Sequence, residues 1–149
     1  MLPRQFCKGT ELNKKILAGV NLLADYTAAT LGPRGRNVIL KTESGNPMIT
    51  KDGVTVANHV DLEDPFENVG AQIIKQVSAQ TNTSAGDGTT TATVLARAIL
   101  NQSQRYLVAG MSPIELQRGI NLAVDGIVTN LQDMAQPIRS KEDIEHIAT

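Results

Sequence analysis

Apolar residues recur every three or four positions through the first part of the chain, which is the spacing of one face of a long helix. This face runs over Leu12, Ile16, Val20, Leu23, Thr27 and Leu31. Gly32-Pro33 follows directly, and this pair is typical of the end of a helix. The pattern therefore predicts a first helix that extends to about Leu31.

Two short β-prone stretches come next and indicate a hairpin. They are Asn37 to Lys41 and Met48 to Thr50, separated by the turn-forming residues Ser44 to Pro47. Lys51-Asp52-Gly53 follows as a second turn. A lone two-stranded hairpin is marginally stable. We therefore expect later sequence or another subunit to supply partner strands.

Three more long helices are predicted further along the chain. Asp64-Pro65-Phe66-Glu67 and Ser112-Pro113-Ile114-Glu115 each place a capping residue, a proline and a glutamate where a helix begins. Between them a helix is expected from about Thr89 to Val108, closed by Ala109-Gly110. The residues predicted to face inward are Phe66, Val69, Ile73 and Val77 in the helix that begins near Pro65, Ala92, Leu95, Ala98 and Ile99 in the helix that begins near Thr89, and Leu116, Ile120, Ala123, Ile127 and Leu131 in the helix that begins near Pro113.

The last of these helices continues to Ala135, and Pro137 breaks the pattern. Beyond it, Ser140 is expected to cap a short helical segment that holds Ile144 and Ile147. The fold class predicted from these patterns is mainly α, with long helices and one β-hairpin.

Composition narrows the function classes. The formal net charge is −1, so the chain lacks the basic excess typical of proteins that bind nucleic acid or anionic membranes. Cys7 is the single cysteine, which excludes an internal disulfide and favours a reducing compartment. No apolar run approaches the roughly 20 residues of a membrane span. We expect a cytoplasmic protein, with an organellar matrix as the alternative.

The residues Ala85 to Thr91 (AGDGTTT) carry the clearest chemical signal. Gly86 and Gly88 allow the main chain to approach a bulky anion, and the N–H groups of the helix that follows are unpaired at its positive end. Thr89, Thr90 and Thr91 add hydroxyl groups. Asp87 would repel a phosphate unless a cation such as Mg²⁺ stood between them. The alternative is an ordinary turn followed by an ordinary helix cap.

Two other turns could complete a phosphate site, although each sequence is also common at helix ends and in turns that bind no ligand. They are Thr30 to Gly35 and Thr50 to Gly53. The Walker pattern GxxxxGK[ST] is absent from the sequence. His59 and His146 lack metal-ligand spacing, and Cys7 lies outside any activating setting.

Taken together, these segments resemble the group I chaperonins, the GroEL family. Five of them follow the order and spacing of the family's signature segments over nearly the whole chain. They are TLGPRGRNVIL (Thr30 to Leu40), ITKDGVTVA (Ile49 to Ala57), LEDPFENVGAQ (Leu62 to Gln72), AGDGTTTATVLA (Ala85 to Ala96) and AGMSPIELQRGI (Ala109 to Ile120).

The resemblance implies the first half of an equatorial, ATP-binding domain over residues 1–136, an antiparallel bundle of long helices with a β-hairpin, and the start of an intermediate domain over residues 137–149. It implies a chaperone that hydrolyses ATP, forms homo-oligomeric rings and binds non-native client proteins, and it leaves open whether a co-chaperonin is needed as a further partner. The apical domain and the C-terminal return to the equatorial domain, with its second catalytic aspartate, are absent from this chain.

By the same resemblance, Asp52 is the catalytic residue and Asp87 the Mg²⁺ ligand. The ATP-binding residues would be Thr30, Leu31, Gly32, Pro33, Lys51, Gly53, Gly86, Gly88, Thr89, Thr90 and Thr91. Thr30, Lys51 and Thr90 match the positions of the family's potassium site. Two alternatives stay open, namely a chaperonin derivative that assembles and binds nucleotide without productive hydrolysis, and an unrelated helical scaffold in which GDGTTT is only a cap.

Overall fold

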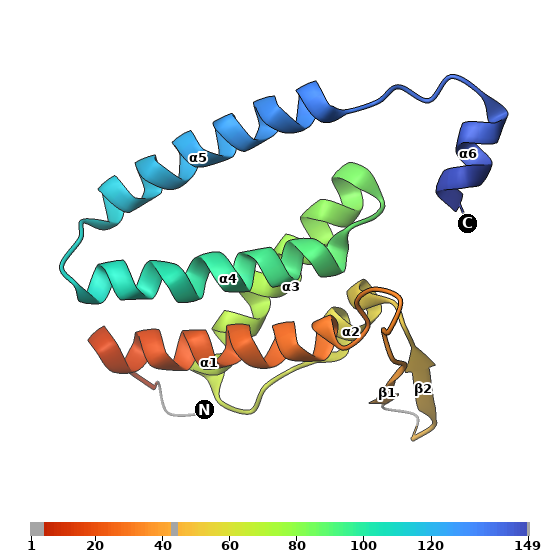
Figure 1. Cartoon of the computed structure of the whole chain (residues 1–149). Coiled ribbons are helices and arrows are strands. Elements are labelled where there is room, and N and C mark those ends of the chain that lie inside the picture. Colours follow the sequence, from red (N-terminus) through yellow and green to blue (C-terminus); the bar gives the residue numbers. More distant parts are fainter. Residues whose placement is uncertain (1–4, 43–44, 149) are drawn as a thin grey trace. The chain divides into compact units, whose positions relative to one another are not determined.

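A computed structural model describes residues 5–42 and 45–148 (Figure 1). The chain divides into two compact units, Met1–Gln104 and Arg105–Thr149. The elements, in chain order, are α1 (Gly9–Ala28), β1 (Val38–Lys41), β2 (Pro47–Thr50), α2 (Gly53–His59), α3 (Pro65–Ala85), α4 (Thr89–Val108), α5 (Pro113–Met134) and α6 (Lys141–Ala148). The described part is therefore mainly helical with one hairpin, as the sequence predicts.

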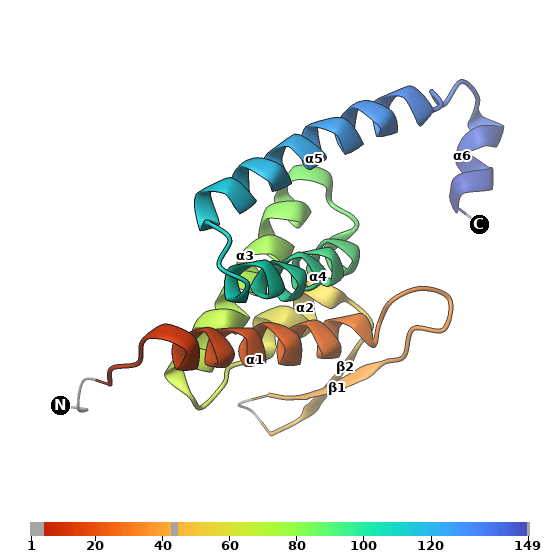
Figure 2. The same ribbon diagram turned by 60° about the vertical axis from the view of Figure 1, so that its left-hand side comes forward.

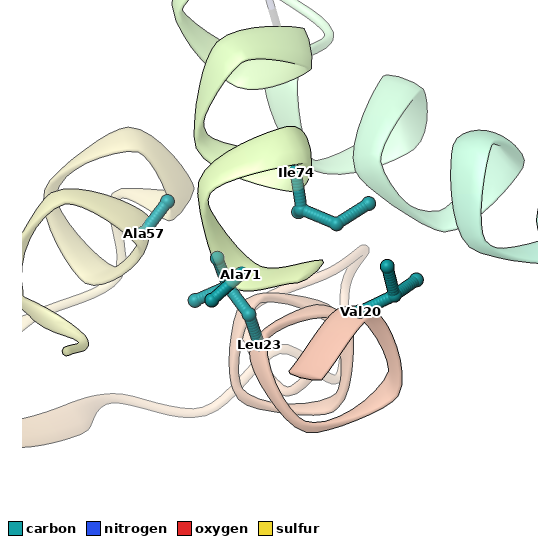
Figure 3. Packing of buried hydrophobic residues seen from close by; sticks show 5 residues of the cluster. All are labelled: Val20, Leu23, Ala57, Ala71 and Ile74. Atoms are coloured by element: carbon teal, nitrogen blue, oxygen red, sulfur yellow. The ribbon is translucent and has the colours of Figure 1, made fainter. Parts of the chain in front are cut away.

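The core of the first unit lies where three helices meet. Val20 and Leu23 of α1, Ala57 of α2, and Ala71 and Ile74 of α3 are fully buried and form one apolar cluster (Figure 3). Ala96 and Leu100 of α4 pack against this cluster from outside. Small and branched aliphatic side chains thus fill a core that contains no aromatic ring among its fully buried members.

Helices α1 and α3 cross in close contact because glycine is present on both sides of the crossing. A Cβ atom built on Gly19 would lie 1.8 Å from the carbonyl oxygen of Glu67. One built on Gly70 would lie 1.9 Å from the carbonyl oxygen of Ile16. Backbone atoms cannot move aside as a flexible side chain can, so this crossing requires glycine at both positions.

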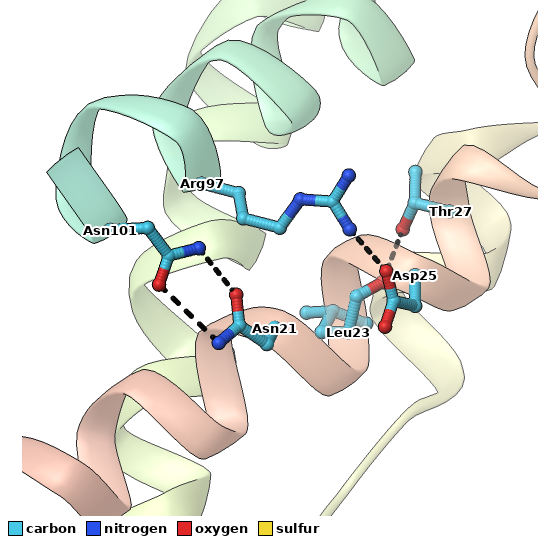
Figure 4. Close-up of polar contacts among 6 residues, drawn as sticks. All are labelled: Asn21, Leu23, Asp25, Thr27, Arg97 and Asn101. Atoms are coloured by element: carbon cyan, nitrogen blue, oxygen red, sulfur yellow. Dashed lines mark hydrogen bonds and ion pairs between the residues drawn. The ribbon is translucent and has the colours of Figure 1, made fainter.

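Helix α4 runs antiparallel to α1. Asn21 of α1 exchanges two hydrogen bonds with Asn101 of α4, at 2.7 and 3.4 Å (Figure 4). One turn further along, Asp25 pairs with Arg97. The partner number falls as the α1 number rises, which fixes the antiparallel direction. These polar contacts connect the second half of α1 to the middle of α4.

The hairpin forms with Ile39 opposite Ile49 and Leu40 opposite Met48. Leu40 is buried, whereas Ile39 and Ile49 are 69% and 63% exposed. Figure 2 shows the two strands as an arm that extends from the loop after α1. The hairpin therefore presents one apolar pair to the core side and one to solvent. Part of the predicted turn, residues 43–44, lies outside the described residues.

Two details of the predicted helices were wrong. The first helix ends at Ala28, and residues Ala29 to Leu31 continue as turns, so Leu31 is exposed. In α3 the buried face contains Gly70, Ala71, Ile74 and Ser78, while the predicted Val69 is 48% exposed. The close crossing at Gly70 explains the difference, because it turns the face with the smallest side chains toward α1.

The predicted inward face of α4 was also wrong. Leu95 and Ile99 are exposed, whereas Thr89 and Thr93 are buried and Ala96 and Leu100 touch the core. The helix therefore turns a face that begins with threonine toward the core. The sequence pattern does not predict helix α2, because Lys51-Asp52-Gly53 is equally typical of a turn. It is short, and Asp52 caps its beginning.

The predicted caps were largely correct. Asp64 accepts hydrogen bonds from the amides of Phe66 and Glu67 and begins α3, followed by Pro65 at the first helical position. Ser112 begins α5 through its carbonyl group, which accepts from the amide of Leu116, but its hydroxyl makes no capping bond.

In the second unit, Ser140 caps α6 by accepting a hydrogen bond from the amide of Asp143 at 3.1 Å, as predicted. None of the residues of α5 is buried, and of the inward face predicted for it Leu116 and Ile120 are half-buried while the rest is exposed. In the described part of the chain, no helix combines the length and the apolar character that crossing a bilayer requires.

Candidate functional site

Three segments that are distant in the sequence enclose one cavity of about 270 Å³ in the first unit. They are the loop after α1, the junction of β2 with α2, and the loop between α3 and α4. In Figure 1 these segments come together where α1 ends and α4 begins. The lining residues are Thr30, Leu31, Gly32, Lys51, Asp52, Gly53, Asp87, Gly88, Thr89, Thr90 and Thr91.

The first wall is a tight loop that follows α1. Gly32 has a φ of 71°, in the left-handed region that favours glycine. The loop is closed by two main-chain hydrogen bonds, from Gly35 to Gly32 at 2.9 Å and from Arg36 to Ala29 at 2.8 Å. The hydroxyl of Thr30 donates to the carbonyl of Thr27 at 2.8 Å, which fixes this side chain at the edge of the cavity.

The second wall is the beginning of α2. The carboxylate of Asp52 caps this helix by accepting from the amide of Thr55 at 2.9 Å. Gly53, the first helical residue, packs so closely on the third wall that a Cβ atom there would lie 2.3 Å from Oγ1 of Thr90. Glycine at this position therefore allows Asp52 and Thr90 to share one cavity.

The third wall is the loop of Gly86 to Gly88 and the first turn of α4. Both glycines have positive φ, 72° and 79°. The first intrahelical bond of α4 runs from the amide of Ala92 to the carbonyl of Gly88, at 2.9 Å. The amides of Thr89, Thr90 and Thr91 thus have no acceptor within the helix, and they lie at its positive end. An anion in the cavity would meet these donors.

The charges of the lining explain which anion could bind. Lys51 is the cationic residue among the described lining residues, and two carboxylates, Asp52 and Asp87, belong to the same lining. Hydrogen bonding by the Thr55 side chain holds the pKa of Asp52 below its ordinary value, although partial burial opposes this. A polyphosphate would therefore meet two negative charges and would need a cation to enter.

The carboxylates of the lining fit a Mg²⁺ ion that is bound together with a nucleotide. Asp87 is exposed in the lining, and one of its oxygens accepts from the amide of Gly88 at 2.7 Å. In the described part of the chain no group of three or more Asp, Glu, His or Cys residues could hold a metal alone. Mg²⁺ commonly uses one or two carboxylates and takes its remaining ligands from phosphate and water.

Potassium would need other ligands. Thr30 and Thr90 can offer hydroxyl oxygens, and Thr30 keeps its lone pairs free because its hydrogen bond to Thr27 is a donated one. The ammonium of Lys51 cannot bind a cation, so only the main-chain carbonyl of this residue fits.

The structure brings together most of the residues predicted from the sequence. Two of them, Pro33 and Gly86, do not line the cavity. Both lie next to lining segments, where Gly86 ends α3. Sequence reasoning missed Thr55, which contacts Asp52, because a threonine inside an unpredicted helix carries no motif of its own. The sequence pattern Asp-x-x-Thr, a helix cap, could have indicated this contact.

Buried hydroxyl groups belong to the elements behind this cavity. Thr27 donates to the carbonyl of Leu23 and Thr93 to that of Thr89, each at 2.9 Å. Both side chains bond within their own helix, so they add no ligand to the cavity. The hydroxyl of Ser78 is buried and finds no partner within the described part of the chain.

A second cavity, of about 250 Å³, lies in the second unit beside α6. Asp143 contributes to its lining, but its carboxylate accepts from the amides of Arg139 and Ser140 at 3.0 Å each. These bonds keep the pKa of Asp143 below its ordinary value. The carboxylate therefore acts as a helix cap there, and the first cavity remains the stronger candidate.

Comparison with known protein families identifies a match. The TCP-1/cpn60 chaperonin family matches this chain over residues 23–149, a range that includes all three walls of the cavity.

Proposed function

The chain belongs to the TCP-1/cpn60 chaperonin family, and from this premise we propose that its cavity binds ATP with Mg²⁺ and serves an ATP-hydrolysing chaperonin ring. One observation carries the proposal. The loop after α1, Asp52, and the GDGTTT segment line a single cavity although they lie far apart in the sequence. Chance packing of three unrelated turns would not gather two carboxylates, a lysine and a free helix N-terminus.

The phosphates would lie against the beginning of α4. The unpaired amides of Thr89 to Thr91 and their hydroxyl groups donate to phosphate oxygens, and the positive end of the helix favours their charge. Gly32 leaves open space for the nucleotide at another wall, since a Cβ atom built there would meet no atom within 4 Å. Lys51 lies in the same lining and would offset part of the negative charge.

Mg²⁺, when bound at Asp87, would neutralise the phosphates and polarise the γ-phosphoryl group. Asp52 would act on water. Its carboxylate accepts a proton from the attacking water, whose oxygen bonds to the γ-phosphorus while the bond to the bridging oxygen of ADP breaks. A carboxylate with a lowered pKa remains ionised at neutral pH, which this role requires. Thr30, Thr90 and the carbonyl of Lys51 would hold K⁺.

Ring assembly is the second part of the proposal. The hairpin presents the exposed pair Ile39 and Ile49 and two strand edges. Strands from a neighbouring identical subunit would satisfy the edges and cover the pair. Asp52 follows β2 by two residues, so this contact would reach the ATP cavity directly. Non-native client proteins and a co-chaperonin would be the further partners, bound by parts outside this chain.

Two measurements on the complete subunit test the enzymatic part. Titration with Mg-ATP should show binding, and the steady-state assay should show hydrolysis. In Asp52→Ala, kcat should fall by about 10²-fold or more, because the variant lacks the base that accepts the proton. Binding should survive, because the variant also loses the repulsion between this carboxylate and the γ-phosphate. Hydrolysis at the parental rate would contradict the role of Asp52.

The binding-only alternative makes the opposite forecast for the parental protein. If the parental protein were a chaperonin derivative without productive hydrolysis, it would bind Mg-ATP and form rings. It would then release phosphate no faster than the Asp52→Ala variant. The presence of both Asp52 and Asp87 in one lining favours the hydrolytic enzyme.

The assembly part is tested by Ile39→Pro, which removes a main-chain donor and kinks β1, and by the milder pair Ile39→Thr with Ile49→Thr. Analytical ultracentrifugation should show a shift from rings toward monomers in both. Val69→Thr, an exposed apolar change on α3, is the matched control and should leave the rings intact. Unchanged rings in both hairpin variants would exclude the hairpin as an assembly element.

A further inference from the structure

The side chain of Asp52 is held by the residue three positions later. Both donors of Thr55 contact the same carboxylate oxygen, Oδ2. The amide lies at 2.9 Å and the hydroxyl Oγ1 at 2.5 Å. The main chain of Asp52 is fixed as well, because its amide donates to Oγ1 of Thr50 at 3.0 Å. Asp52 is thus restrained at its backbone and at one of its two oxygens.

A helix cap explains only part of this arrangement. Capping satisfies an amide that has no partner within the helix, and here the amide of Thr55 is that donor. The hydroxyl needs no such partner, because Thr55 is only half-buried and water can reach it. Its short bond therefore acts mainly on the carboxylate. It prevents rotation about the bond to the carboxyl group and engages Oδ2 a second time.

The two carboxylate oxygens of Asp52 therefore have different roles. Oδ2 carries both bonds from Thr55, and Oδ1 carries neither. An ionised carboxylate that can rotate presents either oxygen in many directions, whereas one fixed at Oδ2 presents Oδ1 in a single direction. Placement of a proton acceptor within a fraction of an ångström affects the rate of proton transfer far more than it affects ligand binding.

We propose that Thr55 is a positioning residue for ATP hydrolysis, whose hydroxyl fixes Oδ2 of Asp52 so that Oδ1 receives the proton of the attacking water. This inference rests on the proposed function of the cavity. Thr55 itself is not among the residues that line the cavity. Its removal should therefore slow the chemical step and leave nucleotide binding in place.

The test uses Thr55→Val, which keeps the size of the side chain and the capping amide but removes the hydroxyl. In the complete subunit, kcat should fall about tenfold, while KM and the dissociation constant of Mg-ATP stay within about twofold. Thr55→Ser restores the hydroxyl and should recover most of kcat. A purely structural role would lower stability and change kcat and KM together.

Thr129→Val is the matched control. Thr129 likewise lies on a helix, but its hydroxyl donates to a backbone carbonyl, that of Asp125, and not to a carboxylate. It also lies outside the cavity. It should leave both constants unchanged. Thr55→Ala replaces Thr55→Val if circular dichroism shows that the latter fails to fold.

The outcomes separate the two claims. If Asp52→Ala is slow but Thr55→Val has parental kcat, or if Thr55→Ser is as slow as Thr55→Val, the role of Thr55 is wrong and the cavity assignment stands. If Asp52→Ala hydrolyses ATP at the parental rate, the proposed function fails and the role of Thr55 fails with it.

Discussion

Gly53 and Thr90 are in direct contact across the candidate ATP cavity. A Cβ atom on Gly53 would lie 2.3 Å from Oγ1 of Thr90 and 3.1 Å from the methyl group of Thr27. The contact joins the beginning of α2, which carries Asp52, to the beginning of α4, which carries the threonine run. The absence of a side chain at residue 53 therefore sets the width of the cavity.

We expect Gly53→Ala to destabilise the fold and weaken nucleotide binding. Overpacking costs about 1–3 kcal/mol, partly offset by the better helix propensity of alanine, about 1 kcal/mol. The hydroxyl of Thr90 must turn away, so Mg-ATP affinity should fall as well. In a double-mutant cycle with Thr90→Ala, urea unfolding should show that the second change relieves part of the cost of the first. Strictly additive free energies would mean that the two residues do not touch.

Substitutions at the crossing of α1 and α3 should destabilise the fold more than Gly53→Ala does. Gly19→Ala and Gly70→Ala each place a methyl group less than 2 Å from a backbone oxygen. We expect a loss of about 3 kcal/mol or more in the free energy of unfolding, because the two helices must separate.

Gly119→Ala and Gly126→Ala are matched controls within α5, since a Cβ atom at either position meets nothing within 4 Å. Each should stabilise its helix by about 0.5–1 kcal/mol. If Gly19→Ala and Gly70→Ala unfolded at the same urea midpoint as the two α5 controls, the close crossing of α1 and α3 would be contradicted.

The sequence predicted the existence and order of the long helices, because their apolar period and their caps are local signals. It failed on which face of α3 is buried. Periodicity selects the largest apolar residues, such as Val69, whereas the close approach at Gly70 favours the smallest. Helix α2 was missed because seven residues are too few to show a period.

The residues predicted for the site lie close together in the structure. Asp52, Asp87 and the threonine run were selected from turn chemistry and family resemblance, and the fold gathers them in one lining. The contact of Gly53 with Thr90 and the bond from Thr55 to Asp52 could not be predicted as distances, since they depend on how three elements pack.

The two polar links between α1 and α4 should respond differently to salt. The Asn21–Asn101 pair is partly buried and neutral, so its coupling energy, about 1 kcal/mol, should not change with ionic strength. The Asp25–Arg97 pair is more exposed and should contribute about 0.5 kcal/mol at low salt and almost nothing at 1 M NaCl. Double-mutant cycles by urea unfolding at both salt concentrations check this. A salt-sensitive asparagine pair would contradict the pairing drawn in Figure 4.

The pair of Lys15 and Asp64 predicts a pH dependence at both extremes. The hydrogen bond from Lys15 lowers the pKa of Asp64, and the same bond raises the pKa of Lys15. The Asp64 contribution is present above the unfolded pKa, about 4, and is lost as pH falls through the lower folded value. The Lys15 contribution is present below the unfolded pKa, about 10.4, and is lost as pH rises through the higher folded value.

Lys15→Met should therefore flatten the stability profile at both ends. Thermal unfolding of this variant and of the parental protein across the pH range checks the prediction. Lys14→Met, one residue earlier on the exposed side of α1, is the control and should keep the parental profile. A Lys15→Met profile that is as steep as the parental one in acid would mean that the pair does not form.

The most direct test of the central claim is calorimetric titration of ATP into the complete subunit with and without Mg²⁺. In the parental protein, Mg²⁺ should strengthen ATP binding by at least about tenfold, because it neutralises the phosphates beside two carboxylates. In Asp87→Ala the affinity should fall and the Mg²⁺ dependence should disappear, whereas Asp133→Ala, an exposed carboxylate of α5, should behave like the parent. Parental affinity and parental Mg²⁺ dependence in Asp87→Ala would contradict the assignment of this cavity as the Mg-ATP site.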